Sequence, residues 1–177
     1  MELLKKQTIY WTLFSFEQWL LILAATTEGL CYVGNLEQFQ AWSAKTTLKN
    51  TLIAQNDELM VPYSEQFREY LQGERKQFTI PIDFLGTEFQ KSIWEVLLEI
   101  PFGETCSYSE IAERIHKPQA VRAVGTAIGA NPILIVVPCH RVIGKNNTLT
   151  GYRSGLEMKA MLLQLEGAAH SATGSNH

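Results

Sequence analysis

Five consecutive aliphatic residues, 133–137, stand between Pro132 and Pro138 and constrain the fold more than any other segment of the chain. A continuous apolar run of this length, without alternating polar positions, is typical of a strand that is buried on both faces. Proline at each end confines the strand to the run itself, because proline has no N–H to donate to a sheet. We therefore predict a short buried strand over 133–137, with Cys139 held just beyond its end.

The size and composition predict an ordinary globular protein. A chain of 177 residues, 46% hydrophobic and 10% aromatic, can bury a core of its own and fits one domain or two small ones. Its three cysteines, at wide spacings and without a Cys-x-x-Cys pair, indicate neither a disulfide framework nor a closed zinc site. No apolar run approaches the roughly 20 residues that cross a bilayer, and the start of the chain is a poor signal peptide. We expect free thiols, no membrane contact and a cytoplasmic location.

The first half of the chain indicates a small α/β lobe. Runs of β-branched and aromatic residues separated by a turn predict a small antiparallel sheet, and Pro62 is a suitable start for a helix. The predicted segments are, in order, sheet strands within 7–16 and 19–33 with a turn at 27–29, a region of helical tendency at 36–60, a helix at 62–71 and a short strand at 78–82.

A composition shift at 83–86 divides the chain. We predict an N-terminal lobe at 1–85 and a C-terminal lobe at 86–167. The small and polar residues of 168–177 predict a disordered tail.

Two capping boxes mark helix starts in the second lobe. Thr87 with Gln90, and Ser107 with Glu110, have the spacing at which each side chain bonds the other's backbone N–H. The first predicts a core helix that ends before Pro101, and the second predicts a short helix that begins at Tyr108. Further helices are expected at 119–128 and 156–166. The pair within 108–128 has helix-turn-helix proportions, although a plain helical hairpin that packs through alanines explains it equally well.

The charge is distributed unevenly. A net charge of −3 argues by itself against a protein that simply coats nucleic acid. Residues 1–85 carry 7 basic and 10 acidic side chains, whereas 114–156 contains six basic residues and no Asp or Glu. Such a segment attracts phosphates, but an ordinary solvated surface explains it as well. The six residues are Arg114, Lys117, Arg122, Arg141, Lys145 and Arg153.

Cys139 is the candidate nucleophile. A rigid strand end would hold it firmly, and His140, Arg141 and a nearby helix N-terminus are each able to lower the pKa of its thiol. Neighbouring side chains of an extended segment point to opposite sides, so the sequence does not guarantee a direct bond between Cys139 and His140, and a bridging water is the alternative. These features leave a buried structural cysteine equally open. For Cys31 and Cys106 a structural role is favoured.

The string Pro-Cys-His-Arg-Val-Ile-Gly at 138–144 resembles the active-site motif of the methylated-DNA–protein-cysteine methyltransferases, the O6-alkylguanine-DNA alkyltransferases. The resemblance extends over 86–167. It implies an α/β (α+β) protein with a small RNase-H-like N-terminal lobe. The C-terminal lobe would be helical, with a winged-helix-like helix-turn-helix.

The resemblance assigns roles to particular residues. The catalytic set is Cys139 as nucleophile, His140 as its base through a water, Glu166 to orient the histidine, Tyr108 as donor to the leaving base, and Asn131 as a brace. The DNA-binding set is Arg122 as the arginine finger, Ala123 and Gly125 as small residues that admit the backbone, and Tyr108. The substrate pocket is Val142, Tyr152, Arg153 and Ser154.

The implied function is DNA repair by irreversible transfer of the alkyl group from O6-alkylguanine to Cys139, once per molecule, after base flipping. Double-stranded DNA, bound through its minor groove, is the expected partner of a monomer. Alkyl size and activity on O4-alkylthymine stay open. We expect no cofactor, because the sequence has no Gly-x-Gly-x-x-Gly motif or phosphate loop. We also expect no metal, because the lobe in which some members carry zinc has one cysteine and no histidine here. The alternatives are a Cys-His hydrolase and a helix-turn-helix relative that binds lesions without repair. The nucleophile argues against the latter.

Overall fold

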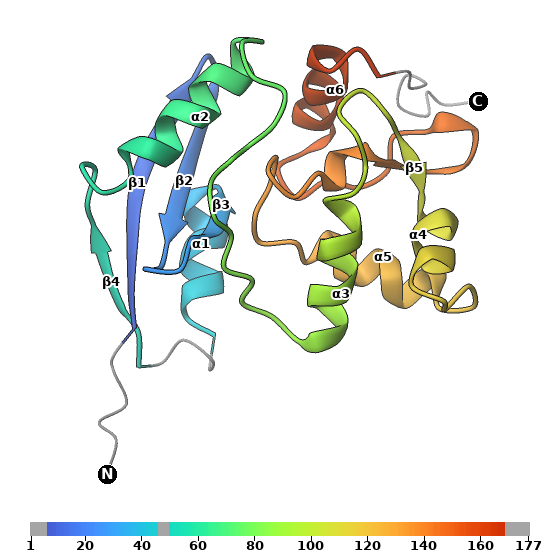
Figure 1. Ribbon diagram of the computed structural model, residues 1–177, viewed down its shortest axis with the longest axis horizontal. Coiled ribbons are helices and arrows are strands. Elements are labelled where there is room, and N and C mark those ends of the chain that lie inside the picture. The colour runs from blue at the N-terminus through green and yellow to red at the C-terminus, as the bar shows by residue number, and fades with distance from the viewer. Residues whose placement is uncertain (1–6, 46–49, 169–177) are drawn as a thin grey trace. The chain divides into compact units, whose positions relative to one another are not determined.

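The computed structural model describes residues 7–45 and 50–168, so the predicted tail lies outside the described residues except for Ala168 (Figure 1). The chain divides into two units, Met1–Phe84 and Leu85–His177, at the composition shift noted above. Among the described residues, none of the helices has the length and apolar character needed to span a membrane.

Unit 1 is built on a four-stranded sheet in the order β3-β2-β1-β4. The strands are β1 (Thr8–Phe16), β2 (Trp19–Ala25), β3 (Leu30–Gly34) and β4 (Leu52–Gln55). The β1–β2 and β2–β3 pairs are antiparallel, which confirms the predicted sheet. Strand β4 lies parallel to β1, with Leu52 opposite Thr8, and all four of its residues are exposed. The prediction of helical tendency for 36–60 is therefore wrong at β4.

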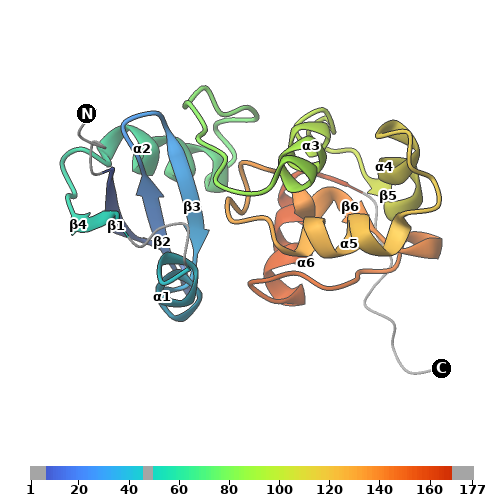
Figure 2. The ribbon, with the colours of Figure 1, turned by 90° about the horizontal axis from the view of Figure 1, so that it is seen from below.

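Two helices cover opposite faces of this sheet (Figure 2). They are α1 (Leu36–Ser43), capped by Asn35, and α2 (Val61–Leu71), which carries a proline in its first turn. Trp11 contacts Phe39 of α1, whereas Phe14 contacts Phe67 of α2. These contacts fall on opposite faces, because side chains an odd number of positions apart point to opposite sides of a strand.

The predicted strand at 78–82 does not form. Ile82 makes only an isolated bridge with Leu30, whose N–H donates to the Pro81 carbonyl at 2.9 Å. Pro81 has no N–H to continue a ladder, so the segment remains irregular.

Unit 2 is mainly helical. Its elements are α3 (Glu88–Leu97), β5 (Cys106–Ser107), α4 (Tyr108–Arg114), α5 (Val121–Gly129), the 3-10 turn η2 (Cys139–Arg141), β6 (Val142–Ile143), η3 (Lys145–Asn147) and α6 (Leu156–Leu165). Both predicted capping boxes are formed, at the starts of α3 and α4. Helices α4 and α5 pack together across a short turn, as a helix-turn-helix requires.

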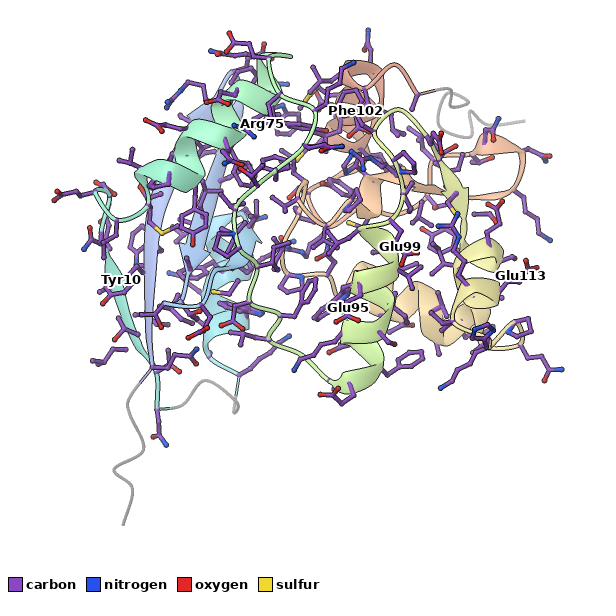
Figure 3. All side chains as sticks on the ribbon, in the orientation of Figure 1. Tyr10, Arg75, Glu95, Glu99, Phe102 and Glu113 are labelled. Carbon is purple, nitrogen blue, oxygen red and sulfur yellow. The ribbon has the colours of Figure 1, made fainter. Side chains whose placement is uncertain are left out.

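Helix α3 is amphipathic as its sequence predicts. Ile93, Trp94 and Leu97 are buried, whereas Glu95 is exposed (Figure 3). The Trp94 indole N–H donates to the carbonyl of Ala127 at 2.9 Å, which ties α3 to α5. This contact fixes the helix that carries the candidate DNA-binding residues.

Residues 133–137 are buried as predicted, but they do not form a strand. They fold into a turn in which Ile135 has φ +74° and the Val137 N–H donates to the Ile133 carbonyl at 3.2 Å. The Asn131 side chain accepts from Ile133 N at 2.9 Å and donates to the Val137 carbonyl at 3.0 Å. The buried backbone thus finds its hydrogen-bond partners within the turn and needs no neighbouring strand.

Candidate active site

Cys139 begins η2 and lines a cavity of about 310 Å³. Its side chain is buried, and the Asn131 amide donates to Sγ at 3.3 Å. Burial raises the pKa of the thiol, while the Asn131 hydrogen bond and the charges of Arg153 and Lys159 act in the opposite direction. The remaining residues that line this cavity are Tyr108, Gly125, Ile128, Gly129, Leu134, Gly151, Tyr152 and Arg153. The resting thiol is therefore protonated and held against a pocket.

His140 and Glu166 form a buried pair beside the cysteine. His140 Nε2 lies 2.8 Å from Glu166 Oε1, and neither side chain is exposed. Because a carboxylate accepts, Nε2 carries the proton and Nδ1 is left as an acceptor. Nδ1 is buried without a hydrogen-bond partner among the described residues. Burial lowers the pKa of His140 against the opposing effect of Glu166, so the imidazole is neutral near pH 7.

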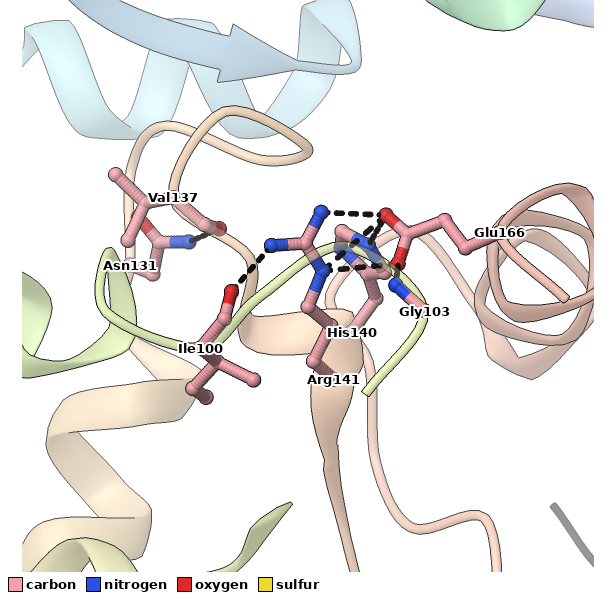
Figure 4. A network of polar contacts seen from close by, with 7 residues as sticks. All are labelled: Ile100, Gly103, Asn131, Val137, His140, Arg141 and Glu166. Carbon is pink, nitrogen blue, oxygen red and sulfur yellow. Dashed lines mark hydrogen bonds and ion pairs between the residues drawn. The ribbon is translucent and has the colours of Figure 1, made fainter. Parts of the chain in front are cut away.

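Arg141 turns away from the thiol. Its Nε donates to Glu166 Oε2 at 2.8 Å, its Nη2 donates to Oε1 at 2.7 Å, and its Nη1 donates to the Ile100 carbonyl at 2.6 Å (Figure 4). The expectation that Arg141 lowers the pKa of Cys139 is therefore wrong. Nor does this buried guanidinium belong to the predicted phosphate-attracting surface.

Asn131 joins the sulfur to the buried turn. Its Nδ2 lies within hydrogen-bond distance of the carbonyls of Ile133 and Val137, at 3.3 and 3.0 Å, as well as of Sγ. One amide group therefore contacts both the sulfur of Cys139 and the backbone of the turn.

Tyr108, the first residue of α4, lines the same cavity as Cys139. Its hydroxyl lies 2.8 Å from the Thr150 hydroxyl. A Cβ added to Gly125 of α5 would lie 3.7 Å from the Tyr108 ring, so the two helices approach closely here.

Arg122 and Ala123 lie apart from the cysteine. Both are exposed on α5 and line a second, larger hollow of about 690 Å³ between α5 and the start of α3. The structure therefore places the predicted arginine finger outside the cavity that Cys139 lines, whereas Tyr108 and Gly125 line that cavity with it.

The predicted substrate-pocket residues divide in the same way. Tyr152 and Arg153 line the cavity, whereas Val142 and Ser154 do not. Val142 is fully buried, and the Ser154 hydroxyl is buried without a hydrogen-bond partner among the described residues.

Lys159 is a site residue that the sequence reasoning missed. It is fully buried on α6, and its Nζ donates to the carbonyls of Val142 and Thr150 at 2.6 and 2.8 Å. Burial lowers the pKa of its ammonium to about 8. Its spacing of seven residues from Glu166, two helical turns along one face, was the available signal. Within the described ranges, no group of three or more His, Cys, Asp or Glu side chains is arranged to hold a metal ion.

Two family models match the chain. The model described as the 6-O-methylguanine DNA methyltransferase, DNA binding domain, matches residues 88–168, and the ribonuclease-like domain of the same family matches residues 9–84.

Relatives agree over nearly the whole length. The inducible methylated-DNA–protein-cysteine methyltransferase of Bacillus subtilis is 49% identical over 176 residues, 97% of this chain and 98% of the relative. The corresponding protein of Methanosarcina acetivorans is 46% identical over 160 residues, 90% of this chain and 99% of the relative.

Solved structures share the fold. The crystal structure of Mycobacterium tuberculosis O6-methylguanine methyltransferase has a TM-score of 0.77 at 38% identity, covering 90% of this chain and 93% of that one. The same organism's OGT in complex with DNA has a TM-score of 0.73 at 37% identity, covering 90% and 92%. With a buried Cys-His-Glu set in the matching fold, the chain belongs to the 6-O-methylguanine DNA methyltransferase family.

Proposed function

We propose that this protein repairs DNA by transferring the alkyl group of O6-alkylguanine irreversibly to its own Cys139, once per molecule. One observation carries the proposal. The thiol of Cys139 borders a cavity while a neutral histidine, fixed by Glu166, lies next to it in the chain. The similarity to methylated-DNA–protein-cysteine methyltransferases gives the substrate class.

The chemistry is a displacement at carbon. His140 Nδ1 takes the proton of Cys139 through a water, and the thiolate attacks the alkyl carbon on guanine O6. The carbon–sulfur bond forms as the carbon–oxygen bond breaks, and the electron pair passes to the guanine. Because the guanine leaves with negative charge, its departure requires a hydrogen-bond donor that stabilises this charge. The hydroxyl of Tyr108, which lines the same cavity, supplies this hydrogen bond.

Entry of the base requires extrusion from the duplex. The cavity of about 310 Å³ falls at the low end of the range for small-molecule sites, about 300–1,000 Å³. Arg122 is exposed on α5, where its side chain is able to fill the space that the base leaves. The small residue Ala123, exposed beside Arg122, admits the DNA backbone from the minor-groove side, whereas Gly125 faces the Cys139 cavity and leaves room there for the base. A relative crystallised in complex with DNA supports DNA as the partner.

The protein acts as a monomer in the cytoplasm under this proposal. Every residue assigned to the chemistry comes from unit 2 of a single chain. Cys31, Cys106 and Cys139 are all free thiols, which suits a reducing compartment.

Intact-protein mass spectrometry after incubation with an O6-methylguanine duplex tests the function. We expect a gain of one methyl group per molecule, mapped by peptide analysis to Cys139. Repeated turnover without a mass gain would instead support a Cys-His hydrolase. Binding to the lesion without any mass gain would support a non-repairing lesion binder, and either result overturns the proposal.

A further inference from the structure

Glu166 is shared between a histidine and an arginine. Its Oε1 lies 2.8 Å from His140 Nε2 and accepts from Arg141 Nη2 at 2.7 Å, while its Oε2 accepts from Arg141 Nε at 2.8 Å (Figure 4). A long contact from the Gly103 N–H at 3.5 Å completes the set. The guanidinium of Arg141 donates to both oxygens of the carboxylate, whereas the imidazole of His140 contacts only one of them.

The bonds from Arg141 to Glu166 matter because an unpaired carboxylate would make His140 a poor base for the thiol. A buried carboxylate that bonds an imidazole favours the charged imidazolium, and an imidazolium cannot accept the proton of a thiol. Because the guanidinium of an arginine carries a positive charge, the pair of Arg141 with Glu166 is close to neutral overall. At His140, the positive charge of Arg141 therefore offsets part of the negative charge of Glu166 and acts in the same direction as burial.

The other charged and titratable groups around His140 do not take over this task. Lys159 on α6 acts on His140 in the same direction as Arg141, but more weakly, and its Nζ donates to two carbonyls instead of to Glu166. Cys139, the preceding residue of η2, is a protonated thiol. The direct compensation of Glu166 therefore comes from Arg141.

We propose that Arg141 is a positioning residue for the alkyl transfer, which by neutralising Glu166 keeps His140 uncharged with Nδ1 able to take the proton of Cys139. The proposal rests on the proposed function and deepens its mechanism. Arg141 does not touch the reacting atoms and acts only through Glu166 and His140.

The guanidinium of Arg141 is also held by contacts outside the Glu166 pair. Its Nη1 donates to the Ile100 carbonyl at 2.6 Å, and its central carbon lies 5.9 Å from the centre of the Phe102 ring. These contacts use the planar fork of arginine in two directions at once, which a lysine ammonium cannot reproduce. The turn between α3 and β5 thus helps to set the geometry of the base.

The test measures the pH dependence of single-turnover transfer from free O6-benzylguanine, a substrate that needs no DNA docking. In parallel, NMR follows the titration of His140, with its signal assigned among the four histidines by loss in H140Q. For Arg141→Met we expect both midpoints to rise by about one pH unit or more. That shift means about a tenfold loss of rate below the midpoint and near-normal rates at alkaline pH.

Two further variants separate charge from structure. In the double variant R141M/E166Q neither charge remains, so both midpoints should return to the wild-type value or below it. Arg141→Gln keeps a donor for Glu166 without the charge, so it should raise the midpoints as R141M does and serves if R141M fails to fold. The matched control is Arg75→Met, which breaks the partly exposed Arg75–Glu69 pair of unit 1 and should change neither midpoint.

Equal slowing of R141M or R141Q at every pH, with unchanged midpoints, would reduce Arg141 to a structural part and overturn the proposal. A raised midpoint that persists in R141M/E166Q would overturn it too. Failure of the proposed function is distinguishable, because the wild type would then gain no alkyl mass while the His140 titration would still be measurable.

Discussion

The two units bury different kinds of side chain. Unit 1 has an interior of aromatic and aliphatic groups, in which Tyr32, Phe39 and Trp42 contact one another with ring centres 4.9–6.0 Å apart. In unit 2, by contrast, the interior includes the imidazole of His140, two cations and a carboxylate. Of the residues that the structure describes, every buried charged or histidine side chain belongs to unit 2.

This difference indicates where folding energy is given up for chemistry. Buried charges cost stability unless they are paired and hydrogen-bonded, whereas buried rings contribute it at about 25 cal/mol per Å². We therefore expect substitutions in the core of unit 1 to change stability with little effect on rate. Substitutions in the polar interior of unit 2 should change the rate first.

The sharpest test of this division compares two buried cysteines. Cys139→Ala should abolish transfer and leave binding to a lesion-containing duplex, because the thiol does the chemistry and contributes little to docking. Cys31→Ala, in strand β3, should transfer at the wild-type rate and lose about 1 kcal/mol of stability. Alkyl mass gain, a gel-shift titration and thermal melting measure the three quantities. Dealkylation by the Cys139 variant would contradict the site assignment.

The next largest effect concerns the base. His140→Ala should slow transfer about 100-fold at pH 7, with partial recovery under alkaline conditions, since bulk hydroxide replaces a lost general base. Phe67→Ala in unit 1 should lose about 3–5 kcal/mol of stability without a comparable change in rate. Single-turnover rates across pH and urea unfolding measure both. An unchanged pH profile in the His140 variant would remove this residue from the mechanism.

A smaller, substrate-dependent effect is expected at the surface of unit 2. Arg122→Ala should lose about tenfold in rate on a lesion-containing duplex, less on a single strand and almost nothing on free O6-benzylguanine, because only the duplex requires extrusion. Rates on the three substrates at one salt concentration measure this. Equal losses on single strand and duplex would indicate phosphate neutralisation instead. An equal loss on the free base would mean damage to the pocket.

The smallest effect is on stability against acid. His140 has a lowered pKa in the folded state, so below about pH 6.5 the unfolded state binds the extra proton and stability falls as pH falls. The loss is at most about 1.4 kcal/mol per pH unit for one proton. Amide hydrogen exchange between pH 7 and 5 should show it in unit 2 and not in unit 1, and His140→Gln should remove it. A slope that survives in that variant would assign the effect to other groups.

The local signals of the sequence were reliable where the hydrogen bonds are local. Thr87 with Gln90, and Ser107 with Glu110, satisfy each other's backbone within one turn, so the starts of α3 and α4 were predicted correctly. The aliphatic run at 133–137 indicates burial but not backbone conformation, because Asn131 satisfies a turn as well as a sheet would. Strand β4 carries no alternating pattern, since all of its residues are exposed.

In the candidate active site, too, the contacts between distant segments could not be predicted from local sequence patterns. Family resemblance led to the pairing of His140 with Glu166, but the direction in which Arg141 points depends on a 3-10 turn that no short-range pattern indicated. Lys159 lies within an apolar helix face, and only the two carbonyls that reach it from distant segments explain a buried ammonium there. Long-range contacts of this kind are outside the reach of periodicity.

Because the two cysteines outside the site are unreactive, the mass of each molecule shows whether it has already reacted. Burial raises the pKa of Cys31 far above the usual range and that of Cys106 to about 11, so both thiols stay protonated and unreactive near neutral pH. If Cys139 alone accepts an alkyl group and never releases it, each chain stores one event as a permanent change of mass. The modified fraction of a population would then count the lesions removed, so the protein would double as a dosimeter of the damage it repairs.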